Sequence, residues 1–421
     1  MRIGIQLALA TFGCGVLAGS AAADMLSALL PAGVPGYGTA PGVTVASRLR
    51  PETQPSGVRA GAFVLHPVLE EAIGYDSAPF GSASGGSWLL GTRPSLLVGS
   101  DWSRHALGAY VAMDDSRYLD APAQSRTDFT ASLGGALDIG RDRLTLSAAH
   151  LAQHQDRTQI GALATDRPVA FRLDDARASY ALTAGSWTVT PNVQFASWQF
   201  SNSTLQGAPL AQNYRDRALL EGGLTLGYEL APRRDVLLVT RALTQHYLHG
   251  QPNQPERDST GYQVLFGFTD DDGGVWRYSV LAGLESRQFA ASVYRAHTAA
   301  IGEAELAWNV TGMTTLTATL TRSMEDAAQE GVAGFTYTAA KLSVDHEYRR
   351  DLLLHVSAGV QRADFLQGGG YQTGYAAGLG VTWLMSRRLH VAATYDVSAQ
   401  HGAYPASYTR HLTMLTLRLG L

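Results

Sequence analysis

Residues 262–285 read YQVLFGFTDDDGGVWRYSVLAGLE, and the pattern of this stretch decides the class of fold. Before the turn, Tyr262, Val264 and Phe266 alternate with Gln263, Leu265 and Gly267. After the turn, Trp276 and Val280 continue an alternation of the same kind. Successive side chains of a β-strand point to opposite faces, so each half predicts a strand with one apolar face. The polar turn between the halves predicts an antiparallel hairpin.

The same period of two continues from Gly57 to the last residue, Leu421. Long polar segments such as SNSTLQGAPLAQN (201–213) alternate with short turns, so each hairpin repeat takes roughly 40 residues. Eight short turns and nine longer loops predict about 18 antiparallel strands. This even number and the asymmetry of the connections are typical of an outer-membrane β-barrel, with short periplasmic turns and longer extracellular loops. We place the short turns near Asp101, Gly140, Gly185, Arg233, Asp272, Thr311, Arg350 and Arg387.

Composition and charge exclude several other classes of protein. Charged residues make up 16% of the 421 residues, and the net charge is −4. Because the chain has no basic block, nucleic acid is not its expected ligand. No run of about 18 apolar residues follows residue 24, which excludes a transmembrane helix. An exported soluble protein or an outer-membrane barrel therefore remains.

The N-terminus predicts export and divides the chain into three parts. Residues 1–23 combine Arg2, a short apolar stretch and small residues before a cleavage site after Ala23, as in a secretory signal peptide. The single cysteine, Cys14, lies within this leader. Residues 24–56 are rich in Pro and Gly, and we expect either a flexible periplasmic segment or a partial plug of the barrel. Residues 57–421 form the predicted barrel.

Aromatic residues distinguish a membrane barrel from a soluble propeller with a similar repeat length. Six of them fall close to the short turns, on the apolar parity of their strands. Amphipathic rings settle at the membrane–water boundary, so this row predicts the periplasmic aromatic belt. Its members are Trp187, Phe268, Trp276, Trp308, Tyr348 and Trp383.

The opposite parity predicts the residues that line the interior. Hydrocarbon offers no partners for backbone polar groups, so the sheet must close, and about 18 strands leave room for water. The plainest interpretation of the inward charges is a solvated wall with ion pairs; the functional one is a mildly acidic path for a hydrated solute. The candidate lumen-lining residues are Arg59, Arg93, Asp128, Glu221, Glu229, Arg277, Glu285, Glu303, Glu305, Lys341, Asp345, Glu347, Asp396 and Arg418.

Several segments resemble the putative β-barrel porin type 2 family. Residues 57–80, GVRAGAFVLHPVLEEAIGYDSAPF, are similar to the family's first strand, although Ala78 stands where the family often has Asn. The segments SDWSRHALGAY (100–110), LGYELAPRRDVLL (226–238), TTLTATLTRSMED (314–326) and VDHEYRRDLLL (344–354) also resemble the family in order and spacing. The resemblance implies an outer-membrane barrel without catalytic residues. It also implies that some relatives export capsular or extracellular polysaccharide with a periplasmic export protein.

These observations lead to one hypothesis about function and two alternatives. We first expect a channel in the bacterial outer membrane that exports polysaccharide together with a periplasmic partner. The alternatives are a passive uptake porin for small sugars or ions, and a structural or adhesive barrel with a plugged lumen. Because no loop is longer than about 18 residues, the sequence disfavours a porin narrowed by an infolded loop.

Catalytic and metal-binding chemistry have little support in the sequence. His150 and His154 would lie roughly 13 Å apart along one strand, too far for one metal ion. The acidic run at 270–272 lacks the spaced oxygen ligands of a calcium site. No nucleophile has a base and an orienting acid at a recognisable spacing. We therefore expect no enzyme activity, no metal and no cofactor.

Repeated arginines at the short turns carry one further hypothesis. Their long stems can lie along apolar surface while the charges stay in water, which explains the recurrence without a ligand. Alternatively, they line one sector of the periplasmic rim where an acidic partner docks. The six residues are Arg233, Arg234, Arg349, Arg350, Arg387 and Arg388.

Overall fold

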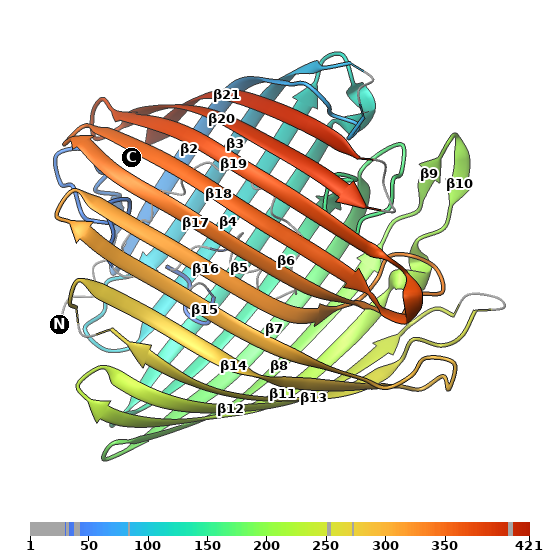
Figure 1. Ribbon diagram of the computed structural model, residues 1–421. Helices are drawn as coiled ribbons and strands as arrows, with labels where there is room; N and C mark the ends of the chain where they lie inside the picture. Colours follow the sequence, from blue (N-terminus) through green and yellow to red (C-terminus); the bar gives the residue numbers. More distant parts are fainter. Residues whose placement is uncertain are drawn as a thin grey trace.

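The computed structural model describes residue 30 and residues 33–37, 43–82, 85–250, 254–271, 273–402 and 407–421. The predicted leader therefore lies outside the described residues. The described chain forms one closed antiparallel barrel of 18 long strands (Figure 1). These strands are β2 (Phe63–Asp76), β3 (Ser87–Ser100), β4 (Ala106–Tyr118), β5 (Arg126–Ile139), β6 (Asp142–Gln155), β7 (Val169–Ala184), β8 (Trp187–Phe200), β11 (Arg217–Ala231), β12 (Arg234–Tyr247), β13 (Ser259–Asp270), β14 (Trp276–Phe289), β15 (His297–Thr311), β16 (Thr314–Glu325), β17 (Phe335–Arg349), β18 (Leu352–Phe365), β19 (Tyr371–Leu384), β20 (Leu389–Gly402) and β21 (Tyr408–Gly420).

Pairing between the first and last long strands closes the sheet. Val68 of β2 pairs with Gly420 of β21, and the ladder continues to Asp76 and Leu412. The short strand β1 (Val58–Ala60) pairs with the beginning of β2. Strands β9 (Ser203–Leu205) and β10 (Ala208–Leu210) form a separate hairpin that projects beyond the barrel in Figure 1. Every long strand is thus paired on both sides, as hydrocarbon surroundings require.

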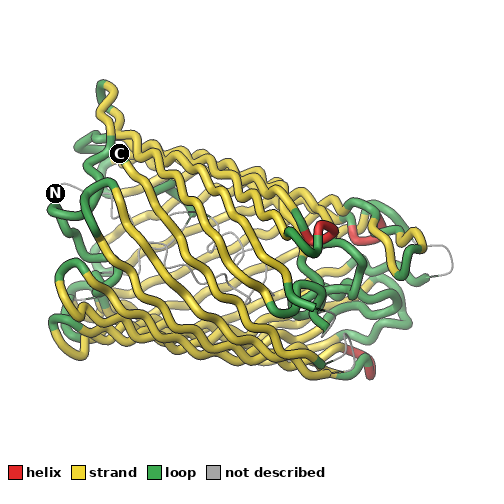
Figure 2. The backbone as a smooth tube through the Cα atoms, turned by 90° about the horizontal axis from the view of Figure 1, so that it is seen from above, coloured by secondary structure: helices red, strands yellow, loops and turns green. Residues whose placement is uncertain are grey.

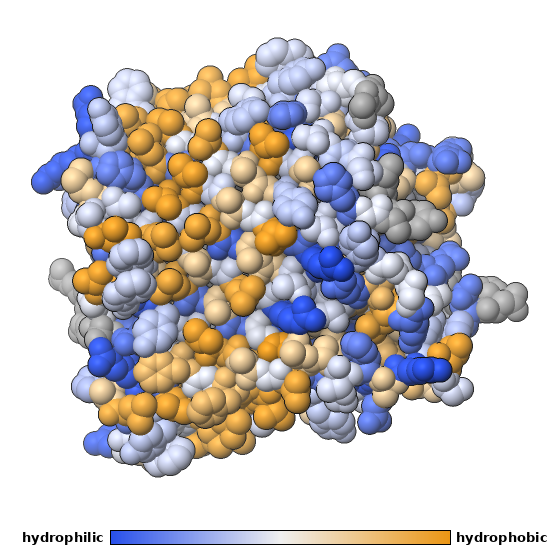
Figure 3. All heavy atoms as spheres, viewed as in Figure 1, coloured by the Kyte–Doolittle hydropathy of each residue, from blue (hydrophilic) through white to orange (hydrophobic). Residues whose placement is uncertain are grey.

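Burial follows the predicted alternation, with apolar side chains exposed on the outside. Tyr262 and Phe266 on β13 are 60% and 63% exposed, whereas Leu265 between them is only 1% exposed. Large exposed apolar residues recur on nearly every strand, and they form the orange surface in Figure 3. In a soluble protein such a surface would be a liability, but in lipid it is the favourable arrangement.

The two ends of the barrel have different connections. At one end, two-residue turns such as those at Gly140 and Gly185 join the strands, and both glycines have positive φ. Arg233 takes the same left-handed conformation, with φ of 63°, in the turn between β11 and β12. At the other end the connections are longer and fold into an irregular layer (Figure 2). The eight predicted short turns all fall between the strands that the structure places there, with the turn at 271–275 described except for residue 272.

Helical structure contributes little to this fold. The described helices are three short 3₁₀ turns: η1 (Pro122–Gln124), η2 (Asn213–Arg215) and η3 (Leu366–Gly368). None of the helices in the described part of the chain is long and apolar enough to cross a membrane.

Candidate functional site: the lumen and its two constrictions

The described residues between 30 and 56, here called the lumen segment, lie against the inner wall. Leu30, Val34 and Tyr37 are almost completely buried and join one apolar cluster with Leu151 and Leu173 of β6 and β7. Strand residues that this segment contacts, such as Leu97, Asp175 and Glu347, have the buried parity of their strands. The parity opposite the exposed apolar residues therefore faces the interior.

Two wall glycines allow the lumen segment to approach the sheet closely. A Cβ atom added at Gly108 of β4 would lie 2.4 Å from the carbonyl oxygen of Gly33. A Cβ added at Gly134 of β5 would lie 1.9 Å from the carbonyl oxygen of Pro35. Any larger residue at either position would push the segment away from the wall.

Polar contacts fix the far end of this stretch to the wall. The Tyr37 hydroxyl donates to Oδ1 of Asp175 on β7 at 2.9 Å, and the Arg177 guanidinium lies 5.1 Å from the Tyr37 ring centroid. Burial, followed by the neighbouring Asp175 carboxylate, raises the pKa of Tyr37, which therefore stays a hydrogen-bond donor.

The second part of the lumen segment, residues 43–56, is anchored near the short-turn end. Nη2 of Arg50 lies 2.8 Å from Oε2 of Glu347 on β17, and both side chains are largely buried. The same Arg50 donates to the carbonyl oxygen of Val45, whose backbone N–H donates to Thr315. His390 of β20 contacts the Thr53 carbonyl at 2.7 Å. The two described parts of the segment thus lie on different sides of the barrel, with residues 43–56 against β16–β20 and Tyr37 against β7.

A cavity remains between the lumen segment and the wall formed by β17–β21. Its volume is roughly 820 Å³ when the adjoining open solvent is included. Val45 and Ala46 form one side, and Asp345, His355 and Asp396 are among the polar residues of the other. Predicted lumen residues therefore border water-accessible space beside the segment.

The connection between β6 and β7, residues 156–168 and here called the mouth loop, folds across the other end of the barrel. The backbone N–H of Gly161 donates to Oε1 of Gln372 on β19 at 2.7 Å. Ile160 packs against Phe335 and Tyr337 of β17. Since β17–β19 lie on the far side of the 18-strand ring from β6 and β7, the loop spans the mouth. The mouth loop is a short connection, and it nevertheless reaches across the mouth to Gln372. Our expectation that short loops disfavour an infolded constriction is therefore wrong.

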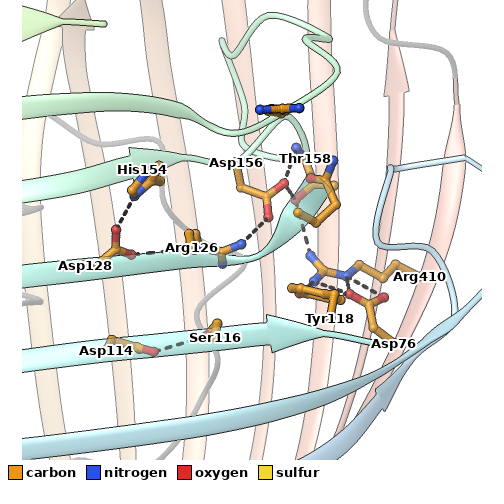
Figure 4. A network of polar contacts seen from close by, with 12 residues as sticks. Asp76, Asp114, Ser116, Tyr118, Arg126, Asp128, His154, Asp156, Thr158 and Arg410 are labelled. Atoms are coloured by element: carbon orange, nitrogen blue, oxygen red, sulfur yellow. Dashed lines mark hydrogen bonds and ion pairs between the residues drawn. The ribbon is translucent and has the colours of Figure 1, made fainter. Parts of the chain in front are cut away.

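Buried charges clamp the mouth loop to the wall (Figure 4). Asp76 at the end of β2 and Arg410 of β21 form an ion pair whose shortest distance is 2.6 Å, with side chains 0% and 5% exposed. Arg410 also donates to the hydroxyl of Thr158 in the loop at 3.3 Å. Thr158 in turn donates to Asp156 through both its backbone N–H and its hydroxyl.

The Asp156 carboxylate extends this network toward β5. Nη1 of Arg126 lies 3.5 Å from Asp156, and Arg126 also lies 3.8 Å from Asp128 (Figure 4). Burial alone would raise the pKa of Asp156, but Arg126, Arg410 and the Thr158 donors together hold that pKa below its usual value. Asp156 is therefore ionised at neutral pH and can hold the loop by charge-assisted hydrogen bonds.

Other loops complete the layer at the mouth. Arg257 donates to the carbonyl oxygens of Ala327 and Tyr214, and so joins three different loops. Asp326 lies 3.1 Å from Arg287 and 3.3 Å from Arg217. Burial would raise the pKa of Asp326, yet those two guanidinium groups and Gln245 lower it overall. The mouth is thus covered by loops tied to one another and to the wall.

Charged side chains of the inner wall form a row at mid-height from β11 to β15. Arg241 of β12 lies 3.9 Å from Glu221 and 3.7 Å from Glu303. Gln263 donates to Glu285, which also pairs with Arg287 at 3.0 Å. Since Glu303 is more than half exposed, this row borders the open part of the lumen.

The predicted lumen-lining residues take different places in the structure. Those on the long strands have the inward parity of Leu265 and Val239, and several meet in pairs: Arg93 with Asp114, Arg418 with Glu70, Asp345 with His355 and Glu347 with Arg50.

Glu229 and Arg277 lie near the short turns, where Arg277 pairs with Asp271. Lys341 and Glu303 are exposed, and Glu305, Glu221, Asp128 and Asp396 are partly buried. Arg59 is different, because it precedes the first long strand and forms an exposed pair with Asp101.

Sequence reasoning missed important charges of the interior. Asp76, Asp175, Arg177, Arg241 and Arg410 all lie on the inward face but were not among the candidates. Parity counting could have found them, since the opposite parity of each of their strands carries exposed apolar residues, such as Ile73, Leu182, Leu238 and Leu415. The contact between Thr158 and Arg410 gave no signal, because the two lie 252 positions apart in the chain.

The six predicted belt aromatics all have outward parity and lie near the short turns. Trp276 and Trp308 stack with ring centroids 4.5 Å apart. Trp187 lies 4.8 Å from Tyr228, and Phe268 lies 5.7 Å from Tyr278, which adds two aromatics to the row. Tyr348 and Trp383 are exposed on β17 and β19.

The six rim arginines form two groups rather than one sector. Six strands separate the β11–β12 turn from the β17–β18 turn in a ring of 18. Several of the arginines contact carboxylates of their own chain: Arg233 with Asp271, Arg234 with Asp270, Arg349 with Asp351, and Arg350 with Glu52. Docking of an acidic partner at this rim stays a prediction.

The two histidines considered as metal ligands have carboxylate partners instead. His150 lies 2.7 Å from Asp174, and His154 lies 2.7 Å from Asp128. Among the described residues, no group of three His, Cys, Asp or Glu side chains is arranged to hold a metal ion.

A closed 18-strand barrel, apolar outside and charged inside, defines a channel-type protein of the bacterial outer membrane. The chain belongs to the family described as Putative beta-barrel porin 2, whose sequence model matches residues 50–421. The fold and family are those of channel proteins rather than enzymes. The resemblance drawn from the sequence is therefore confirmed.

Similar solved structures include other outer-membrane barrels at low identity. OpdK of Pseudomonas aeruginosa is 11% identical, with a TM-score of 0.44 and coverage of 85% of this chain and 98% of that chain. OccK2 (OpdF) of Pseudomonas aeruginosa in complex with glucuronate is 12% identical, with a TM-score of 0.46 and the same coverage. A BenF-like porin from Pseudomonas fluorescens Pf-5 is 9% identical, with a TM-score of 0.44 and coverage of 86% and 99%. No curated protein matches the chain.

Proposed function

We propose that this protein is a passive channel through which small hydrophilic solutes, such as sugars or ions, cross the outer membrane. The observation that carries this proposal is the mouth loop, which spans the barrel and is bonded to Gln372 on the far wall and to Arg410 of β21. The lumen segment narrows the passage a second time. Small solutes can pass beside such obstacles by weak, repeated contacts with polar walls.

Export of polysaccharide, the first hypothesis from the sequence, has less support. A polymer strand needs a continuous wide path, and both obstacles are tied to the wall by buried polar contacts. The family description names a porin and no export partner. The small-solute alternative therefore fits the described residues better than the export hypothesis.

A size series of sugars in proteoliposomes tests the proposal. We expect monosaccharides and disaccharides to enter and long oligosaccharides to be excluded, with single-channel current in planar bilayers. Replacing Thr158, Gln159 and Ile160 by glycine should loosen the mouth loop, raise the conductance several-fold and admit longer sugars. The matched control replaces Ser292, Val293 and Arg295, three exposed residues of the β14–β15 connection, by glycine, which should change neither property.

Two results would count against the proposal. Passage of a long polysaccharide through the unmodified protein would return export to first place. A complete absence of current, with the barrel folded, would favour the structural or adhesive barrel instead.

A further inference from the structure

Two glycines on the inward face of β19 leave a trough in the wall of the cavity beside the lumen segment. Gly378 and Gly380 both line this cavity, and neither has a side chain to fill it. The strands on either side, β18 and β20, carry polar side chains opposite both glycines. Because neighbouring strands lie about 4.8 Å apart, these two edges are roughly 10 Å apart. The trough and its edges, here called the glycine recess, comprise His355, Ser357, Gly378, Gly380, Thr394 and Asp396.

The two glycines give the recess two different parts. A Cβ atom added at Gly378 would lie 2.6 Å from Oδ1 of Asp396 and 3.0 Å from Oγ of Ser357. Oxygen atoms from both edges therefore lie over Gly378. A Cβ added at Gly380 would instead lie 3.5 Å from Cβ of His355, which is an ordinary contact. The recess thus has an open floor at Gly380 beside a group of oxygen atoms at Gly378.

Asp396 supplies an acceptor that the wall leaves without a donor. Its Oδ2 is buried, and no described residue donates a hydrogen bond to it. The residue as a whole is partly exposed, and rotation about χ2, which is soft for aspartate, can turn either oxygen toward the cavity. A carboxylate without a donor calls for an explanation, and a solute hydroxyl that donates to it provides one.

The other charged groups of the cavity already have partners within the chain. Asp345 lies 2.8 Å from His355 of β18. Arg418 lies 3.5 Å from Glu70 of β2. The carboxylate of Asp396 is therefore the charged group of the cavity that is left to bind a solute.

Opposite the glycine floor, the lumen segment presents aliphatic carbon. Val45 and Ala46 form that side of the cavity. Arg50 holds them in place, because it donates to the Val45 carbonyl and pairs with Glu347 at 2.8 Å. A molecule in the recess thus meets oxygen atoms at its edge and aliphatic carbon on one face. A sugar ring has the matching chemistry, since hydroxyl groups project from its edge and C–H groups cover its faces.

The same arrangement disfavours charged solutes. An anion would bring negative charge to Asp396, and the Arg418 guanidinium is already paired. For a metal cation, the described residues hold no group of three His, Cys, Asp or Glu side chains arranged as ligands. Neutral hydroxyl groups fit best, because their hydrogen bonds to a carboxylate are charge-assisted.

We propose that the glycine recess binds one ring of a neutral sugar on its way through the lumen, with Asp396 and Ser357 as partners of the sugar hydroxyls. This inference rests on the proposed passage of small hydrophilic solutes and names a substrate class for it. The recess holds the sugar weakly, because each hydrogen bond replaces one to water. Weak binding suits a solute that must also leave the channel.

Binding of three hexoses, glucose, galactose and mannose, to the purified protein tests this inference. Equilibrium dialysis of labelled sugars against the protein in detergent measures binding without requiring passage. We expect at least one hexose to bind saturably. Glucuronate, which keeps the glucose ring and adds a carboxylate, should bind at least about ten-fold more weakly than that hexose.

Two variants and their controls locate the binding in the recess. Asp396→Ala removes the acceptor and Gly378→Ala displaces it, so each should weaken hexose binding at least about ten-fold. Gly91→Ala, at an inward glycine of β3 where an added Cβ would lie 3.5 Å from Ala72, should leave binding unchanged. Asp101→Ala, which removes an exposed carboxylate at the short-turn end, should also leave it unchanged.

Mobility on gels before and after heating shows whether each variant has folded. Because Oδ2 of Asp396 accepts no hydrogen bond from a described residue, Asp396→Ala should fold even if Gly378→Ala does not. Three results would overturn the inference: no binding of any of the three hexoses, undiminished binding by folded Asp396→Ala, or glucuronate binding as tight as that of a hexose.

Entry of the same sugars into proteoliposomes separates this inference from the proposed function. Entry without binding at the recess would refute the recess and leave the channel standing. Binding that Asp396→Ala abolishes, without entry, would refute the channel and leave the recess as a sugar site.

Discussion

The mouth loop and the lumen segment both narrow the barrel, but different contacts hold them. The mouth loop is joined to wall strands at both ends and is clamped by a continuous set of buried charges, Asp76, Arg410 and Asp156 among them. The lumen segment leads into β1 at one end and depends on two separate anchors, Arg50–Glu347 and Tyr37–Asp175. At the mouth, loss of one contact should thus weaken the whole network. In the lumen segment, loss of one contact should release only one anchor.

The largest effect is expected from Asp76→Ala. This change leaves Arg410, which donates to Thr158, buried without the carboxylate that pairs with it. Breaking a buried ion pair in this way costs about 3–5 kcal/mol. We expect a loss of that size in urea unfolding of the lipid-embedded barrel, together with a higher conductance.

The exposed pair of Arg59 and Asp101 provides the control for this change. Since both side chains are more than half exposed, Asp101→Ala should cost at most about 1 kcal/mol. Equal losses for the two variants would show that the mouth network does not clamp the loop.

A smaller effect is expected from Glu347→Ala, which removes one anchor of the lumen segment. Arg50 keeps its hydrogen bond to the Val45 carbonyl, so we expect the lower end of the range, about 3 kcal/mol. The released segment should become accessible to protease while the mouth loop stays protected. Protection of both in the folded variant would mean that the apolar contacts of Leu30 and Val34 are sufficient.

Tyr37→Phe should have a still smaller effect. It removes one hydrogen bond to Asp175, worth about 1 kcal/mol, and keeps the ring that packs against Arg177. Hydrogen exchange of the backbone near residue 37 should become faster, and exchange in residues 156–168 should not change. Faster exchange in both regions would show that the two constrictions are coupled.

The smallest effect is expected from acidification, because the conductance should not change near neutral pH. The folded-state pKa of Asp156 is depressed, so its contribution is fully present above the ordinary value of 3.8 and is lost as the pH falls through the folded value. We expect the conductance to stay constant from about pH 7 to about pH 5 and to change only below about pH 4. Asp156→Asn should abolish the change in conductance at low pH. If the change persists in this variant, another titrating group causes it.

Much of the fold could be predicted because strand alternation is a local property. Tyr262, Val264 and Phe266 have the same parity in the sequence and the same outward face in the structure. The turns at Gly140, Gly185 and Arg233 lie where the pattern stops. The lipid environment reinforces this signal, since every outward position of a membrane-spanning strand must be compatible with hydrocarbon.

The constrictions could not be predicted in the same way. Loop length suggested an open mouth, yet Gly161 reaches Gln372 and Ile160 reaches Phe335. The pairings of Arg50 with Glu347 and of Asp76 with Arg410 join residues separated by 297 and 334 positions. No periodic pattern links such positions, because their proximity depends on closure of the ring.

The sequence by itself determined the membrane-spanning strands, their inward and outward faces, and the two different ends of the barrel. Each of these follows from neighbouring residues and from the demand that lipid makes on every strand. Only the tertiary structure decided which charges meet inside and which segments cross the lumen. Closing an 18-strand ring brings distant strands to opposite sides of one narrow space, and a buried charge there must pair with whatever that space contains.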